Sequence, residues 1–386
     1  MLNKERLIKL LGNRTFANLL SSIISIAAGL LLGLILMIAF KPGVGLKAFE
    51  ILLKGGLQTG MYGLGNILYF MTPILFTGLS VAFSNQTGIF NMGVTGQFTV
   101  GAITAIMIGN LVEMPSSIHW LVCIIAAGIA GIIWSIVPAL LKAHYDVNEI
   151  ITTIMTNYIA MYLANELITK FCFNRPMGVS AAVKASALIP KVGFDKLFPK
   201  TNVNLGFIIA IVLCILVYIL LFKTSVGYGL RAVGFNREAG HYMGVNEKMN
   251  VIISMLASGF IAGLGGGITY LSSMTKTYAV AEVLCADAAN AMPAALLCAS
   301  SPLGLILSSA FISYLNCGSI YIQIFGYTSE TVDVITAVIM YFSAFSMAIK
   351  FILDRTVLNM SGDKNRRRKK AKNKVSIDDT RKEEEQ

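Results

Sequence analysis

Uncharged polar side chains recur at helical spacing in the apolar segment GIFNMGVTGQFTVGA, residues 88–102. Their spacing divides them between two adjacent faces of one helix: Asn91, Thr95 and Thr99 on the first, Gly93, Gln97 and Gly101 on the second. Amide and hydroxyl groups can donate and accept hydrogen bonds without charge, as a neutral polar solute requires. The same groups can also hydrogen-bond across a helix interface. A polar translocation pathway and simple helix packing remain equal alternatives.

A second polar group lies in DVNEIITTIMTNYIAMYLANE, residues 146–166. Asp146 or Asn148 can cap the helix that starts here, and Glu149 is favourable in its first turn because of the helix dipole. Asn157 follows about two turns later in an apolar run. We favour pathway lining over pure packing for Asn157.

Small residues mark a third helix, in SGFIAGLGGG at 258–267. Gly259, Gly263 and Gly267 repeat every four residues, which is the pattern that lets two membrane helices touch backbone to backbone. Helix packing is the favoured interpretation of these three glycines.

The composition requires a membrane, because 55% of the 386 residues are hydrophobic and only 13% are charged. A span needs roughly 20 mostly apolar residues. About ten segments are candidates: 17–40, 66–83, 88–110, 118–141, 150–171, 205–222, 250–273, 286–299, 303–316 and 331–350. The first is too long for a signal peptide and lacks a cleavage site, so it is expected to be retained. The eighth and ninth are short, which predicts half-length or tilted helices inside one all-α bundle.

Basic residues set the orientation. Most of the 31 Lys and Arg residues fall on one side if both termini are cytoplasmic, as the positive-inside rule requires. The domains are then a cytoplasmic basic head (1–16), a transmembrane domain (17–350), and a disordered tail (351–386) that is basic and then acidic. The domain would contain a cytoplasmic loop at 223–249 and an extracytoplasmic loop at 172–204. The basic tail favours anionic lipid as its partner, not nucleic acid.

Charged groups are scarce at mid-span, because Glu149, Glu166, Glu282, Asp287 and Asp333 all fall near span ends or in loops. A proton- or sodium-coupled carrier normally buries a carboxylate, so this class is disfavoured. The six cysteines stand singly and the three histidines lie far apart, so no metal site is expected. An intramembrane enzyme is disfavoured as well, since the sequence has no GxSxG motif and no paired mid-span carboxylates.

The cytoplasmic loop contains the mixed-charge cassette VGFNREAGHYMG, residues 233–244. It predicts a short helix that ends at Gly244, where glycine can adopt a positive φ. A short helix along the membrane surface is a natural docking element for a soluble partner.

These residues resemble a known family. The segment REAGHYMG resembles the Glu-Ala-Ala-xxx-Gly loop of ABC importer permeases, and its context GYGLRAVGFNREAGHYMGV is similar to the branched-chain amino acid, ribose and nucleoside permease family. The segments FNMGVTGQFTVGA and VNEIITTIMTNYIA agree in order, as does SSPLG at 300–304. The resemblance covers about 60–345 and is strongest to the simple-sugar and nucleoside branch.

The resemblance implies a division of labour among subunits. Coupling to a partner would fall to one group: Arg237, Glu238, Ala239, Gly240 and Gly244. The implied partners are an ATP-binding cassette subunit, a second permease (a copy or a relative) and an extracytoplasmic substrate-binding lipoprotein, in a bacterial plasma membrane. The chain has no GxxxxGK[ST] motif, so it needs no cofactor of its own and ATP with Mg²⁺ would be used by the partner.

Two departures from the family pattern bear on specificity. Thr95 stands where the family has Glu, and ADAANAMPAALLCASS (286–301) replaces a Gly/Asp-containing segment. We therefore expect an ABC importer permease that moves a nucleoside or simple sugar, with Asn91, Thr95, Gln97 and Asn157 as pathway residues. A permease for branched-chain amino acids and a secondary carrier or channel without an ATPase are the alternatives. The outer loop 173–204 could meet a binding protein or be a plain connector.

Overall fold

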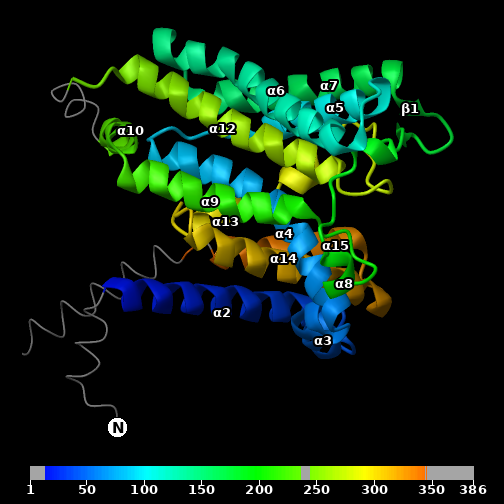
Figure 1. The fold of residues 1–386 in the computed structure, drawn as a ribbon. Helices are drawn as coiled ribbons and strands as arrows, with labels where there is room; N and C mark the ends of the chain where they lie inside the picture. Colours follow the sequence, from blue (N-terminus) through cyan, green and yellow to red (C-terminus); the bar gives the residue numbers. More distant parts are fainter. Residues whose placement is uncertain (1–13, 236–243, 344, 346–386) are drawn as a thin grey trace, which may run out of the picture.

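The computed structural model describes residues 14–235, 244–343 and 345. Within these residues the chain forms α-helices, short 3₁₀ turns and one small hairpin (Figure 1). The longer helices are α2 (Arg14–Phe40), α3 (Gly45–Gln58), α4 (Met61–Gln86), α5 (Val94–Leu111), α6 (Ser116–Tyr145), α7 (Glu149–Phe171), α9 (Leu205–Lys223), α10 (Ser225–Phe235), α12 (Glu247–Tyr270), α14 (Gly304–Ile322) and α15 (Ser329–Ser343). The short elements are β1 (Phe173–Asn174), β2 (Val179–Ser180), η1 (Ala185–Ala187), α8 (Phe194–Leu197), η2 (Ala286–Ala288), α13 (Ala291–Leu297) and η3 (Gln323–Phe325).

The prediction of a multi-pass all-α membrane protein is confirmed. In the described part of the chain, six helices are long and apolar enough to cross a membrane: α4, α5, α6, α9, α12 and the α14–η3 segment. α2 adds the shorter apolar stretch Ile24–Phe40. α7 falls outside this set, yet Ile151, Met155 and Ile159 make one strongly exposed apolar face. Each of the ten predicted segments contains a helix, but fewer than ten have the length and hydropathy of a span.

The structure confirms one prediction about an individual segment, corrects a second and adds a helix that was not predicted. The eighth segment is short as predicted, because α13 has only seven residues and is about 10 Å long, far less than the membrane thickness of about 30 Å. The ninth is not short, since the α14–η3 segment covers Gly304–Phe325. α3 was not predicted; it buries Ala48 and Leu52.

Local signals explain where the helices begin. Asn148 precedes α7, and its side chain accepts a hydrogen bond from the Ile150 backbone N–H at 2.9 Å, as the capping analysis predicted. Asn204 caps α9 and Asn246 caps α12 in the same way. Asp146 instead ends α6 in the left-handed conformation.

Two groups of helices make up the molecule. In the first, α12 packs against α4, α5 and α6, and the main hydrophobic core lies among these helices (Figure 1). In the second, α2 packs on α15, and α14 packs on α3; Met37, Leu52, Leu315, Ile335 and Ile339 form its core. α14 also contacts α4, so α4 and α14 join the two groups.

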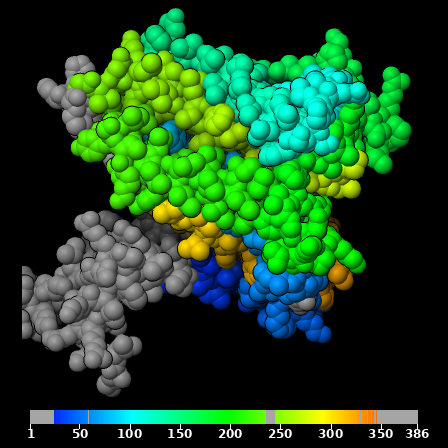
Figure 2. All heavy atoms as spheres, viewed as in Figure 1, coloured from blue at the N-terminus to red at the C-terminus, as the bar shows by residue number. Residues whose placement is uncertain are grey.

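The two ends of the bundle carry different connections. Figure 1 shows α10 and the start of α2 at one end and the β1–β2 hairpin at the other. At the hairpin end, Ser180 donates its backbone N–H to the Tyr278 carbonyl at 2.8 Å, which joins the 172–204 segment to the connection after α12. At the other end, α10 packs on α9, which helps to order the first part of the 223–249 loop. Figure 2 shows α9 and α10 across one face, with residues of the α13–α14 region at the surface between them and α2.

Candidate functional site

Glycines bring α6 and α12 into backbone contact. A Cβ atom on Gly263 would lie 2.4 Å from the Ala127 carbonyl oxygen, and one on Gly259 would lie 2.5 Å from the Gly131 carbonyl oxygen. A Cβ on Gly267 would lie 2.7 Å from the Ala127 side chain. All three glycines of the 258–267 segment therefore face α6 at distances that no larger residue can occupy.

The pathway candidates from the 88–102 segment lie in a buried hydrogen-bond network. The Asn91 amide donates to the Gln97 side-chain oxygen at 3.1 Å and to the Ser258 hydroxyl at 2.7 Å. Ser258 in turn contacts Ser80 Oγ at 2.7 Å, which ties α4, α5 and α12 together. Sequence reasoning did not identify Ser80 and Ser258.

Asn157 joins α7 to the start of α5. Its side-chain oxygen accepts the Gly96 backbone N–H at 2.8 Å, and its amide donates to the Met92 carbonyl at 2.9 Å. Thr95 is half-buried on α5. None of Asn91, Thr95, Gln97 and Asn157 lines the large cavity described next, so a role in the pathway stays a prediction for all four.

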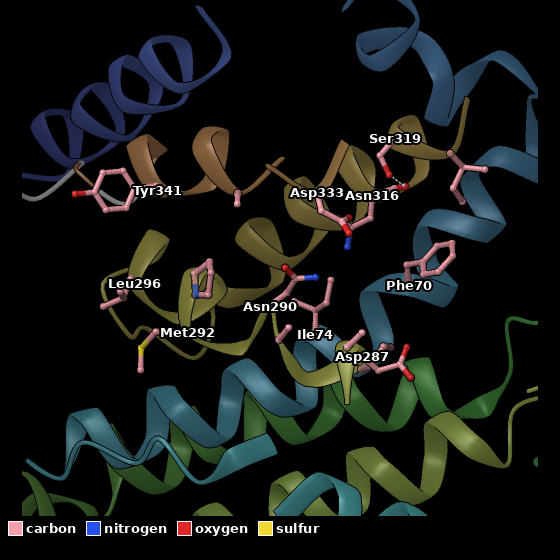
Figure 3. A pocket seen from close by; sticks show the side chains of 16 residues that line it. Phe70, Ile74, Asp287, Asn290, Met292, Leu296, Asn316, Ser319, Asp333 and Tyr341 are labelled. Carbon is pink, nitrogen blue, oxygen red and sulfur yellow. Dashed lines mark hydrogen bonds between the residues drawn. The ribbon is translucent and has the colours of Figure 1, made fainter. Parts of the chain in front are cut away.

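The large cavity lies between the two groups of helices and has a volume of about 690 Å³ (Figure 3). Ligand sites commonly have volumes of about 300–1,000 Å³. Four parts of the chain line it: α4 with Phe70, Pro73 and Ile74; η2–α13 with Asp287, Asn290, Met292, Pro293 and Leu296; α14 with Asn316, Ser319 and Ile320; and α15 with Asp333, Ala337 and Tyr341.

The lining has a polar and an apolar region. Figure 3 shows Asn290, Asn316 and Asp333 near the centre of the view, with Tyr341, Met292 and Leu296 on the left. No Lys or Arg occurs among the described residues of the lining. The cavity can therefore surround a solute that is polar at one end and flat or apolar at the other.

Three polar side chains of the lining are available to hydrogen-bond to a solute: Asn290, Asn316 and Asp333. Within the part of the chain that the structure describes, their side chains make neither a hydrogen bond nor an ion pair. Asn91 and Asn157, by contrast, use their side chains in contacts between helices. A solute gains most from groups that face a cavity and have no partner in the protein, because it does not have to break an existing contact.

Asp287 differs from Asp333 because it is neutralised. Lys276 Nζ lies 2.9 Å from Oδ1 and 2.8 Å from Oδ2 of Asp287, and the Tyr270 hydroxyl donates to Oδ2 at 3.3 Å. Burial alone would lower the pKa of the Lys276 ammonium, but attraction and hydrogen bonding to Asp287 outweigh this effect and raise the pKa. Lys276 therefore stays cationic at neutral pH, and its contact with Asp287 fixes the connection after α12 at the edge of the cavity.

Part of this cavity lining could be anticipated from the sequence. The 286–301 segment was singled out as a departure from the family pattern, and it supplies Asn290, Met292 and Pro293 to the lining. Asp287 and Asp333 enter the sequence analysis only as carboxylates near span ends or in loops, which disfavour an ion-coupled carrier and do not indicate a cavity. Arg237, Glu238, Ala239 and Gly240 of the coupling group lie outside the described residues, and so does the short helix predicted before Gly244. Gly244 itself is exposed with φ +73°, a left-handed conformation that glycine adopts without strain.

A multi-pass helical bundle with a cavity between two groups of helices suits a membrane permease, and comparison with known proteins identifies the family. Residues 63–344 match the family described as the permease component of the branched-chain amino acid transport system. The chain belongs to this family, and it is a permease of an ABC importer, a transporter subunit without an ATPase domain. The resemblance stated from the sequence is confirmed.

Several curated relatives are similar over most of their length. The chain is 32% identical to the guanosine ABC transporter permease protein NupP of Bacillus subtilis (strain 168), over 89% of this chain and 97% of the relative. It is 29% identical to the nucleoside ABC transporter permease protein NupB of Lactococcus lactis subsp. cremoris, over 89% and 94%. It is 28% identical to the glucose ABC transporter permease protein TsgB13 of Haloferax volcanii, over 74% and 76%. No solved structure is significantly similar to the chain.

Proposed function

We propose that this permease moves a nucleoside into the cell and that the cavity between α4, α13, α14 and α15 is the cargo site on the way. One observation carries the proposal: three polar side chains that have no partner among the described residues line the cavity beside an apolar region. These side chains belong to Asn290, Asn316 and Asp333. Amide groups can donate to and accept from the edge of a base. Phe70 and Tyr341 supply aromatic surface that a flat base can pack against.

The charge of the cavity argues against an amino acid as cargo. A branched-chain amino acid is a zwitterion, and its carboxylate would need a cation or helix N-termini at this depth. The described lining offers the carboxylates of Asp287 and Asp333 and no Lys or Arg. A neutral solute fits this arrangement better.

A nucleoside also fits better than a simple sugar. A hexose has hydroxyl groups on all sides, whereas the cavity joins a polar region to Met292, Leu296 and Tyr341. The relatives named for guanosine and nucleosides match 89% of this chain, and the relative named for glucose matches 74%.

The energy for transport would come from partner subunits. An ATP-binding cassette subunit would hydrolyse ATP with Mg²⁺ and dock on the 233–244 cassette; a second permease and an extracytoplasmic binding lipoprotein would complete the complex. α10 and the start of α2 lie at the same end of the bundle (Figure 1), which supports a cytoplasmic location for both. In this orientation the hairpin end would face the binding protein.

Uptake by the complete transporter tests the proposal. The chain and the partners that co-purify with it are expressed in cells without nucleoside uptake of their own, and labelled guanosine, glucose and leucine are supplied separately. We expect ATP-dependent uptake of guanosine alone. Uptake of leucine or glucose without guanosine would overturn the proposal.

Two variants connect the transport to the cavity. Asn290→Leu should lower guanosine uptake at least about tenfold, because the base loses the hydrogen bonds that the Asn290 amide would supply. Asn66→Leu is the matched control, since Asn66 lines a different cavity of about 430 Å³ between α3, α4 and α14. Equal uptake by the two variants, at equal amounts in the membrane, would remove the cavity from the pathway.

A further inference from the structure

Asp333 is the carboxylate in the cavity that has no partner in the described part of the chain. It lies one turn inside α15, which begins at Ser329, and its side chain is exposed to the cavity. It makes no ion pair or hydrogen bond with any described residue. Asp287, the other carboxylate of the lining, uses both of its oxygens on Lys276.

A carboxylate that faces a cavity between the helices of a membrane protein requires an explanation. Ionisable groups in a span are costly and generally face a partner or a water-filled path. The start of a helix stabilises a nearby negative charge, but by at most about 1–2 kcal/mol, and this effect would not require the side chain to face a cavity. An ionised carboxylate only accepts hydrogen bonds, so its natural partner in an otherwise neutral cargo is a group that donates.

Polar side chains lie beside Asp333, and an aromatic side chain lies further along the same helix. Asn316 and Ser319 of α14 line the same region, and the Ser319 hydroxyl already donates to the Asn316 carbonyl at 2.7 Å (Figure 3). Asp333, Ala337 and Tyr341 are spaced four residues apart and share one face of α15. Tyr341 is therefore about 12 Å from Asp333 along the helix axis, which places an aromatic ring beyond the polar end.

We propose that Asp333 recognises the ribose of the cargo by accepting hydrogen bonds from the vicinal 2′- and 3′-hydroxyl groups. This proposal rests on the proposed function. Two adjacent O–H donors match the two oxygens of one carboxylate, and charge-assisted bonds of this kind are about twice as strong as neutral ones. The amides of Asn290 and Asn316 both donate and accept, so they suit the mixed edge of a base better than a diol. The site would select ribonucleosides over nucleosides that lack the two hydroxyls.

The experiment compares guanosine with 2′,3′-dideoxyguanosine as cargo. Both are supplied to wild type, Asp333→Asn and Asp333→Ala in the complete transporter, and initial uptake rates are measured at equal amounts of protein in the membrane. The binding protein is the same in every case, so a change in the ratio of the two rates comes from the permease. Glu50→Gln is the matched control, because Glu50 is an exposed carboxylate on α3, outside the cavity, paired with Lys54.

We expect wild type and Glu50→Gln to prefer guanosine, and both Asp333 variants to reduce this preference at least about tenfold, mainly by slowing guanosine. An unchanged preference in both Asp333 variants, or an equal fall in both rates, would overturn the role of Asp333. Absence of guanosine uptake in wild type would instead overturn the proposed function, so the two failures are distinguishable.

Discussion

Breaking the ion pair between Lys276 and Asp287 should destabilise the connection that leads from α12 to the cavity. The Lys276 side chain is 26% exposed and the Asp287 side chain 22%. The pair is therefore intermediate between a surface pair, which is worth about 0–1 kcal/mol, and a buried pair, whose disruption costs about 3–5 kcal/mol. We expect Lys276→Met and Asp287→Asn each to lower stability by about 2 kcal/mol. The double variant should lose less than the sum, because no unpaired charge remains.

Thermal unfolding of the detergent-solubilised protein measures this cycle. A loss of about 2 kcal/mol corresponds to an apparent Tm lower by about 2–3 °C in a chain of this size. The exposed pair Glu50–Lys54, with both side chains 61% exposed, is the matched control and should give a coupling below about 1 kcal/mol. Additive losses at Lys276 and Asp287 would refute the reasoning, since they would show that the two charges do not interact.

The same pair carries a prediction about pH. Burial lowers the pKa of Lys276, but the charge of Asp287 and the hydrogen bond to it outweigh burial. The net effect raises the pKa above its ordinary 10.5. A raised pKa stabilises the fold fully below the ordinary value, and this contribution is lost as the pH rises through the folded-state pKa. The coupling energy should therefore be the same at about pH 6 and about pH 8, and fall only above about pH 10.5.

Three further predictions concern packing, the polar network and coupling. Gly263→Val should lower the apparent Tm or prevent folding, because its side chain would meet the Ala127 carbonyl, whereas Gly43→Val, with no atom within 4 Å, should be tolerated; equal Tm values would contradict this. Gln97→Leu should insert normally and lower uptake, since it removes an acceptor of the Asn91 amide; unchanged uptake would assign Gln97 to helix packing. Glu238→Arg should abolish co-purification of the ATP-binding subunit without affecting insertion, and retention of that subunit by the variant would contradict a docking role for the cassette.

The positions of the spans could be predicted because burial in lipid leaves a simple signal in the sequence. Residues 205–222 are apolar nearly throughout, and the helix found there is Leu205–Lys223. α3 left no comparable signal, because Glu50 and Lys54 interrupt its apolar residues and its buried face consists of Ala48, Leu52 and three glycines. Helix starts were predictable where a cap residue is present, as at Asn148.

The cavity could not be predicted in the same way, because its lining comes from four elements that are far apart in the sequence. Spacing correctly placed Asn91 and Gln97 near each other, but it could not tell whether such groups face a cavity or one another. From the sequence, the position of Asp333 near the end of an apolar segment indicates only that it is not the mid-span carboxylate of an ion-coupled carrier. Only the packing of α15 against α2 and α14 places that carboxylate beside Asn316.

The place of the cavity in the fold has a consequence for transport. Asp333 belongs to the group of helices that contains α2 and α15, whereas Phe70 and Ile74 lie on α4, which packs on α12. A movement of α15 relative to α4 would change the distance between Asp333 and the α4 wall. α14 would have to stay with α4 in such a movement, because Leu305 and Ile312 of α14 belong to the main hydrophobic core. A nucleoside that contacts both sides would bind the closed arrangement more strongly than the open one, and a ligand shifts an equilibrium only by such a difference in affinity. ATP hydrolysis by a partner would then need to reverse only this difference to release the cargo.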